Sequence, residues 1–257
     1  NLGLRFDNYS DFGSTINPRL GLIWQTKDNL TFKLFAGSAF KSPSFAQLYV
    51  RNNPANLGNN SLNPETVNTL ETGLNVEYQV NYNLLISLNL FEYQAKDLVG
   101  FIFEVESAGN VAQNIGQQKA QGAEFWLKWK PKNNITIDFN YSTLSAKDED
   151  RQEIADIPQK MAYASINWLI NDNWNWAIDA KLIADRVRTP QDLRKKLPNY
   201  TLLNSKLQRV NILKGLNASV IIKNLFDELA KEPSNGNIAE DYPLNGRQII
   251  FELIYNF

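Results

Sequence analysis

The segment Ile135-Thr136-Ile137-Asp138-Phe139-Asn140-Tyr141-Ser142 decides the fold class, because its apolar and polar residues alternate without interruption. In an extended chain, the odd-numbered residues put large apolar side chains on one face and the even-numbered residues put polar ones on the other. This is the pattern of a half-buried β-strand. The same period of two recurs at 70–78, at 248–257 and, with two interruptions, at 174–185, whereas no segment sustains a 3.6-residue period. The sequence therefore predicts an all-β chain.

The connections between the predicted strands fall into two classes. Tight turns such as Asn171-Asp172-Asn173 alternate with long polar loops, so the turns lie at one end of the strands and the loops at the other. This layout is typical of an antiparallel outer-membrane β-barrel with short periplasmic turns and long extracellular loops. We expect long loops at 42–65, 101–118, 148–158, 189–199 and 229–245. We expect about twelve strands, near residues 1–8, 17–26, 30–41, 66–79, 83–100, 119–130, 134–147, 159–170, 174–188, 200–211, 215–228 and 246–257.

Composition excludes several classes of protein. The 257 residues include no cysteine and no histidine, which removes disulfide frameworks, Cys/His zinc sites and histidine-dependent catalytic pairs within this chain. The net charge of -1 gives no general attraction to nucleic acid. The longest apolar run, six residues, is too short for a transmembrane helix. We expect no enzymatic activity, no nucleic-acid partner, no metal site and no cofactor.

A soluble antiparallel sandwich or propeller is the alternative for strands with a period of two. Several predicted strands are far longer than the roughly 5 to 6 residues usual in soluble proteins. All six tryptophans lie close to a tight turn, where an interfacial aromatic girdle would place them. These features favour a membrane barrel over a soluble fold. The predicted polar face also carries charges suited to a wet lumen, namely Glu71, Glu77, Lys128, Asp138, Asp179, Lys181 and Glu252.

Five motifs, in order along the chain, resemble those of TonB-dependent outer-membrane receptors. The main departure is Lys41, where the family usually has arginine, so a cation is kept but the bidentate fork is lost. The similar segments are GSAFKSPSFAQLY at 37–49 (family GRGFRAPSLAELY), NSLNPE at 60–65 (NPDLKPE), LETGL at 70–74 (YELGLEY), NIG and QGAEF at 114–116 and 121–125 (NVGKARIRGVELE), and Asn224-Leu225-Phe226-Asp227 (NLFDK).

This resemblance implies a fold, a function and a set of partners. The family's barrel has about 22 strands and is plugged by an N-terminal globular domain. Residues 1–257 are therefore expected to be the C-terminal portion of that barrel, about its last 12 strands, without the plug. The family imports scarce compounds across the outer membrane of Gram-negative-type bacteria, energised through TonB. The implied partners are the TonB complex acting through the missing plug, outer-membrane lipid and lipopolysaccharide, the barrel-assembly machinery and a ferric chelate.

The motif residues are expected to serve barrel architecture before they serve ligand binding. Proline and glycine at strand ends and within strands have structural uses of their own. A C-terminal signal for barrel assembly is similarly expected at Tyr255 and Phe257. The architectural residues are Phe40, Pro43, Asn63, Pro64, Glu65, Asn224, Leu225, Phe226 and Asp227.

Ligand recognition is expected in the long loops. A group of cations between 186 and 196 would attract an anionic ferric chelate, although contact with lipopolysaccharide or with solvent explains the same charges. Haem receptors of the family that this chain resembles typically place an axial histidine between the first two motifs, and residues 44–60 hold none, which argues against haem in this half of the barrel. A ferric siderophore is the predicted ligand. The candidate ligand-binding residues are Tyr49, Arg51, Arg186, Arg188, Arg194 and Lys195.

Three alternatives stay open from the sequence. A complete 12-stranded passive channel shares the strand pattern but has no reason to carry the receptor motifs. A receptor of the same family for cobalamin or a glycan shares both. An outer-membrane barrel enzyme would need a catalytic carboxylate pair, and no such pair stands out.

Overall fold

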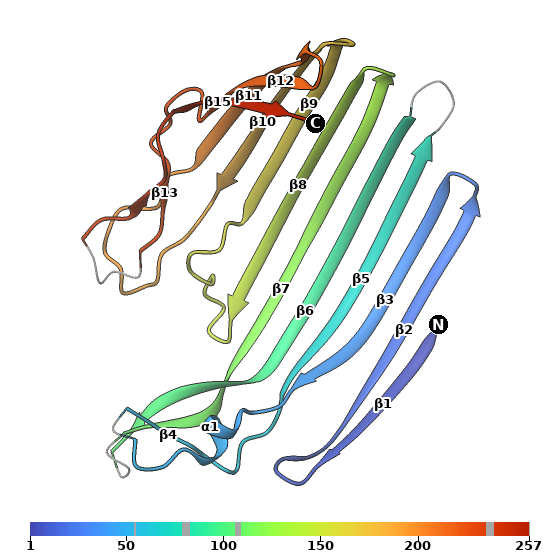
Figure 1. Cartoon of the computed structure of the whole chain (residues 1–257). Helices are drawn as coiled ribbons and strands as arrows, with labels where there is room; N and C mark the ends of the chain where they lie inside the picture. The colour runs from blue at the N-terminus through green and yellow to red at the C-terminus, as the bar shows by residue number, and fades with distance from the viewer. Residues whose placement is uncertain (54, 79–82, 106–108, 235–238, 257) are drawn as a thin grey trace.

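The computed structural model describes residues 1–53, 55–78, 83–105, 109–234 and 239–256. Twelve strands follow one another in chain order to form one curved antiparallel sheet, with β1 at one edge and β15 at the other (Figure 1). The predicted all-β antiparallel fold is thereby confirmed. The twelve are β1 (Leu2–Tyr9), β2 (Gly13–Lys27), β3 (Leu30–Lys41), β5 (Glu65–Tyr78), β6 (Asn83–Glu104), β7 (Gly109–Lys132), β8 (Ile135–Asp148), β9 (Lys160–Asn171), β10 (Trp174–Ala184), β11 (Tyr200–Leu213), β12 (Leu216–Lys223) and β15 (Gln248–Tyr255).

Four short elements lie at the loop end of this sheet. The helix α1 (Phe45–Tyr49) begins at a capping box, in which Ser44 and Gln47 satisfy each other's backbone N–H groups. The two-residue strand β4 (Asn56–Leu57) pairs in parallel with β7. The strands β13 (Lys231–Glu232) and β14 (Tyr242–Pro243) pair with each other in the last long loop. None of these is long enough to leave a periodic pattern in the sequence.

The connections differ from the prediction at two places. The predicted loop at 101–118 is wrong, because β6 and β7 stay paired up to Glu104 and Gly109. The upper part of β7 consists mainly of polar residues and lacks the apolar alternation by which a strand is recognised in the sequence. Its backbone nevertheless pairs with β6. At the loop end, β1 and β2 are joined by only residues 10–12, so the alternation of short and long connections is not strict.

The strand register sorts side chains onto two faces. Ile137, Ile166 and Ile178 are register partners on the face that we call the outer face. Asp138 and Asp179, each paired with Ser165, lie on the opposite, inner face. The same register puts Glu71, Lys128, Lys181 and Glu252 on the inner face and large apolar residues such as Leu88, Phe251 and Leu253 on the outer face.

No second layer covers either face of the sheet within the described ranges. Phe251 is 77% exposed on the outer face, and the buried apolar residues form small clusters at the loop end rather than one central core. The register puts Trp24, Trp129, Trp168, Trp174 and Trp176 on the outer face, as a girdle requires. Trp126 differs, because its pairing with Asn140 puts it on the inner face. Among the described residues, no helix has the length and apolar character needed to cross a membrane.

Candidate functional site

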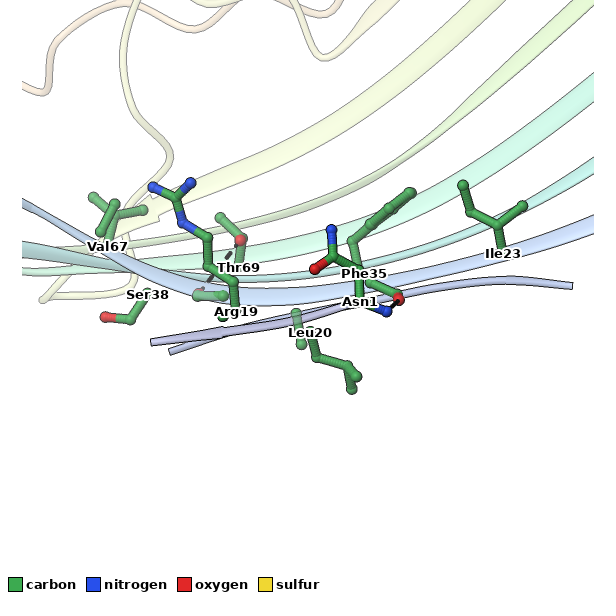
Figure 2. Close-up of a pocket in the computed structure, with 13 residues that line it drawn as sticks. Asn1, Arg19, Leu20, Ile23, Phe35, Ser38, Val67 and Thr69 are labelled. Atoms are coloured by element: carbon green, nitrogen blue, oxygen red, sulfur yellow. Dashed lines mark hydrogen bonds between the residues drawn. The ribbon is translucent and has the colours of Figure 1, made fainter. Parts of the chain in front are cut away.

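A hollow lies on the inner face of β1, β2, β3 and β5. Its volume is about 580 Å³, and Gly3, Gly21 and Gly37 help to open it because they add no side chain. Figure 2 shows Arg19 and Thr69 rising from the side toward which the sheet curves, while Leu20 points the other way. Arg19 forms no ion pair in the described part of the chain, so it is an uncompensated cation on this face. The sequence reading overlooked it, because a lone arginine in a strand carries no motif.

A compact platform beside this hollow is built from the first two receptor-like motifs. Lys41 and Glu65 are register partners, and Lys41 Nζ lies 3.0 Å from Glu65 Oε2. The other carboxylate oxygen of Glu65 accepts the backbone N–H of Val99 at 3.1 Å, where the β6–β7 register shifts. Glu65 is 9% exposed, and Pro43 is also buried. The lysine in place of the family's arginine therefore still pairs with the motif glutamate.

The fourth receptor-like motif joins the same platform through Asn114. Its Oδ1 accepts the backbone N–H of Asn63 at 2.8 Å, and its Nδ2 donates to the carbonyls of Asn63 and Asp97. Leu48 of α1 packs with Leu62 and Ala112 in a buried apolar cluster. These contacts join residues about 50 positions apart, so the platform fixes the 42–64 loop onto the β6–β7 hairpin.

The Asn224-Leu225-Phe226-Asp227 motif closes the last long loop. Asn224 is 4% exposed and has a left-handed backbone, with φ of 50°. Its Oδ1 accepts the N–H of Glu228 at 2.8 Å, and its Nδ2 donates to the carbonyls of Glu228 and Asn245. Asp227 Oδ1 accepts the N–H of Arg247 at 2.7 Å, which ties the loop's two ends together. Phe226, in contrast, is 76% exposed.

The predicted arginine group forms an internal network that we call the loop clasp, which consists of Arg186, Arg188, Asp192, Arg194, Glu232 and Asp241. Arg188 Nη1 lies 2.9 Å from Asp241 Oδ1, across 53 residues of sequence. Arg194 pairs with Asp192 and also donates to Ser234. Arg186 is 1% exposed, pairs with Glu232 at 3.0 Å and stacks its guanidinium on the Tyr200 ring. The clasp thus joins two long loops, and its three arginines already have carboxylate partners.

The pKa values of Asp192 and Asp241 in the clasp are shifted in the opposite direction from that of the nearby Asp156. Hydrogen bonds from Arg188 hold the pKa of Asp241 below its usual value, and hydrogen bonds from Arg194 do the same for Asp192. Partial desolvation raises the pKa of Asp156, an exposed residue whose backbone N–H donates to the Val187 carbonyl. The ionised forms of Asp192 and Asp241 therefore stabilise the clasp, while the charge on Asp156 opposes local folding to a degree that solvent screening reduces.

Replacing Asp156 by asparagine is expected to stabilise the clasp at neutral pH. The folded-state pKa of Asp156 is raised, so its ionised form destabilises the folded loop as pH rises from the ordinary value of 3.8 through the raised one. Asparagine removes the charge and tolerates the left-handed φ of 66°. Amide exchange of residues 185–199 in the full-length protein should slow at pH 7 and stay unchanged at pH 3.

The Asp241→Asn variant is expected to have the opposite effect on the stability of the clasp. In the unmodified protein, the folded-state pKa of Asp241 is below its ordinary value. The ionised carboxylate therefore stabilises the clasp at pH values above the ordinary pKa, and this stability is lost as the pH falls through the lowered pKa. Exchange in this variant should be faster than in the unmodified protein at pH 7. Slower exchange in Asp241→Asn, or faster exchange in Asp156→Asn, would contradict this electrostatic account.

The remaining predicted site residues lie in separate places. Tyr49 is half-exposed on α1, and its hydroxyl donates to Asp11 Oδ1 at 3.0 Å, whereas Arg51 and Lys195 are exposed in different loops. Phe40 joins an aromatic cluster with Tyr9 and Phe12. Tyr255 lies on the outer face and is 55% exposed, and Phe257 lies outside the described residues. The structure therefore brings Arg186, Arg188 and Arg194 together and leaves the other candidates apart.

Comparison with known proteins agrees with this architecture. Residues 1–225 match the family described as TonB dependent receptor-like, beta-barrel. The vitamin B12 transporter BtuB of Vibrio cholerae serotype O1 is 23% identical over 264 residues, which cover 99% of this chain and 39% of BtuB. BtuB of Photobacterium profundum is 24% identical over 242 residues, covering 90% of this chain and 38% of its own.

Solved structures share the same fold. A mutant of the ferric enterobactin receptor PfeA from Pseudomonas aeruginosa superposes with a TM-score of 0.79 at 19% identity, covering all of this chain and 42% of PfeA. The siderophore receptor PirA from Acinetobacter baumannii gives a TM-score of 0.77 at 20% identity, covering all of this chain and 43% of PirA. The chain spans about two-fifths of the length of these relatives. It belongs to the β-barrel family of TonB-dependent receptors.

Proposed function

We propose that this chain is the C-terminal portion of an outer-membrane receptor that imports a ferric siderophore with energy delivered through TonB. The match of residues 1–225 to the receptor family carries this proposal. The outer face meets lipid and the inner face lines the lumen, as the separation of apolar and polar rows suggests. The chain's role is transport and recognition rather than catalysis.

The siderophore assignment draws on the neighbours and on the chemistry of the loops. PfeA is named a ferric enterobactin receptor and PirA a siderophore receptor, and the absence of histidine from this chain argues against haem binding by this part of the barrel. Of the loop cations, Arg51 and Lys195 have exposed side chains and form no ion pair within the described ranges. An anionic ferric chelate approaching from outside would meet these two free charges first. The clasp arginines contribute indirectly, because they hold in place the loop that contains Lys195.

Cobalamin is the second candidate ligand, because the BtuB proteins of Vibrio cholerae and Photobacterium profundum align with 99% and 90% of this chain. Their name states vitamin B12, a ligand that makes much less use of loop cations than an anionic chelate does. The two candidates therefore differ in their dependence on loop charge. Raising the ionic strength should weaken binding of the chelate and have little effect on binding of cobalamin.

Uptake by the full-length receptor that contains this chain distinguishes the candidates. Cells lacking their own siderophore and cobalamin receptors would express it and be given radiolabelled ferric catecholate or cyanocobalamin, with and without TonB. We expect TonB-dependent uptake of iron. Uptake of cobalamin alone would assign the second candidate, and uptake of neither ligand would contradict the proposed substrate classes.

The double change of Arg51 and Lys195 to glutamine is expected to weaken ferric-chelate binding about tenfold at low salt, because it removes two unpaired cations from the entrance. The matched control is Lys27→Gln, which removes an exposed cation at the turn end of the sheet. Equal affinities of the double variant and the control, measured by fluorescence titration of the full-length protein, would remove these two residues from the binding site.

A further inference from the structure

Arg209 is the one charged residue on the outer face of β11, where it lies near the turn end. Its register partners are Trp174 on β10 and Ala218 on β12, and Ala218 pairs in turn with Leu253 of β15. Two residues earlier on the same face, Leu207 pairs with Val220 of β12, which in turn pairs with Phe251 of β15, so these three form an apolar row across the sheet. The N–H of the next residue, Val210, donates to the carbonyl of Asn173 in the tight turn, which fixes Arg209 at that rim.

A hollow lies beside this arginine. Its volume is about 530 Å³, and it opens because Ala218 stands between Arg209 and Leu253 with only a methyl group to fill the row. Such a hollow offers acyl chains more contact than a flat strand surface does. Ser219 and Glu252 also border it, but they lie on the inner face, where Glu252 pairs with Lys206 at 3.2 Å. Its apolar lining consists of Trp174, Leu207, Ile212, Ala218, Val220, Phe251 and Leu253.

The charge of Arg209 lacks a carboxylate partner in the part of the chain that the structure describes. The guanidinium carbon lies 5.5 Å from the centre of the Trp174 ring, which supplies a cation–π contact but no counter-charge. A cation on the lipid face of a barrel is tolerated near the interface and costly at the bilayer centre. At the tryptophan band, phosphate groups are the anions available to a planar, bidentate donor.

We propose that this hollow is a binding site for an anionic glycerophospholipid of the periplasmic leaflet. The phosphate accepts hydrogen bonds from Arg209, and one acyl chain lies along Ala218, Val220 and Phe251. Free phosphate would bind Arg209 without contacting the apolar lining, whereas a neutral lipid would contact the apolar lining without binding Arg209 through a phosphate. The proposal rests on the proposed function, because it requires the barrel to be embedded in an outer membrane.

Photolabelling tests this site in the full-length protein within outer-membrane vesicles. The probe is phosphatidylglycerol with a photoactivatable acyl chain, and the labelled residues are mapped by peptide mass spectrometry. We expect labelling concentrated on residues 207–220 and 249–253. Arg209→Gln should reduce it about fivefold to tenfold through loss of the charge-assisted hydrogen bonds. Ala218→Leu should reduce it by filling the hollow while keeping the charge.

The matched control is Lys214→Gln, which removes an exposed cation from the adjacent β11–β12 turn and should leave labelling unchanged. Equal labelling of the unmodified protein and Arg209→Gln would overturn the proposal, as would equal labelling by a diacylglycerol probe that lacks the phosphate. Loss of label on adding millimolar inorganic phosphate alone would reassign the site to a free anion. Absence of label from every outer-face residue would contradict the membrane location itself, whereas uniform label along that face would overturn only the lipid site.

Discussion

Replacing Asn224 by alanine is expected to destabilise the full-length protein by about 3–5 kcal/mol. The side chain makes three hydrogen bonds to backbone groups of Glu228 and Asn245, each contributing about 1 kcal/mol, and their loss leaves buried polar groups unpaired. Alanine also adopts the left-handed φ of 50° at a cost of about 1–2 kcal/mol, which asparagine largely avoids. The measurement is urea unfolding in lipid vesicles, followed by tryptophan fluorescence.

Phe226→Ala is the control within the same motif. This side chain is 76% exposed, so its removal should change the free energy of unfolding by less than about 0.5 kcal/mol. If both variants unfold at the same urea concentration, the motif does not act through the Asn224 hydrogen bonds.

Replacing Gly58 by alanine is expected to detach α1 from the platform. An added Cβ would lie 2.7 Å from the backbone nitrogens of Tyr49 and Val50 and 2.8 Å from the carbonyl carbon of Leu48. All three are backbone atoms that no rotamer change can move, so overpacking should cost about 1–3 kcal/mol. The hydrogen bonds from Gly58 N to Val50 O and from Asn59 N to Gln47 O would lengthen or break. Amide exchange at 47–50 and 58–62 should accelerate about tenfold or more.

Gly73→Ala is the matched control for this change. At Gly73 the nearest atom to an added Cβ is Asn89 Oδ1 at 3.5 Å, an ordinary contact on the inner face. Its exchange profile over 47–62 should equal that of the unmodified protein. An unchanged profile in Gly58→Ala would show that α1 can shift without loss of its contacts, contrary to the close packing described above.

The strands could be predicted from the sequence because a single sheet with one apolar face imposes a period of two. The segment 135–142 carries that period throughout and forms β8 almost as expected. The upper part of β7 does not, since polar residues occupy both faces where the β6–β7 hairpin extends beyond the apolar rows. The position of Trp126 could not be predicted from the sequence either, because closeness to a turn does not determine which face of the sheet a side chain occupies.

The partners of the loop residues could not be predicted, because they lie far away in sequence. The cations at Arg188 and Arg194 are evident in the sequence, but Asp241, which holds Arg188, lies 53 residues further along. Asn63 and Asn114 are both in recognisable motifs, yet nothing in either motif indicates that they pair. The sequence therefore indicates which residues belong to the motifs, whereas the contacts between them are seen only in the folded loops.

We propose that the curved sheet spans a membrane with its outer face toward lipid and its inner face toward water, and spin labelling of β9 tests this orientation. The chain contains no cysteine, so single cysteines can be introduced at 165, 166, 167 and 168 of β9 in a full-length protein free of other reactive cysteines. Spin labels at these positions would be measured in lipid vesicles for collision with oxygen and with a water-soluble nickel complex. We expect strict alternation, with oxygen collisions favoured at positions 166 and 168 and nickel collisions at 165 and 167. Equal accessibility to both agents at all four positions, or the reverse phase, would contradict it.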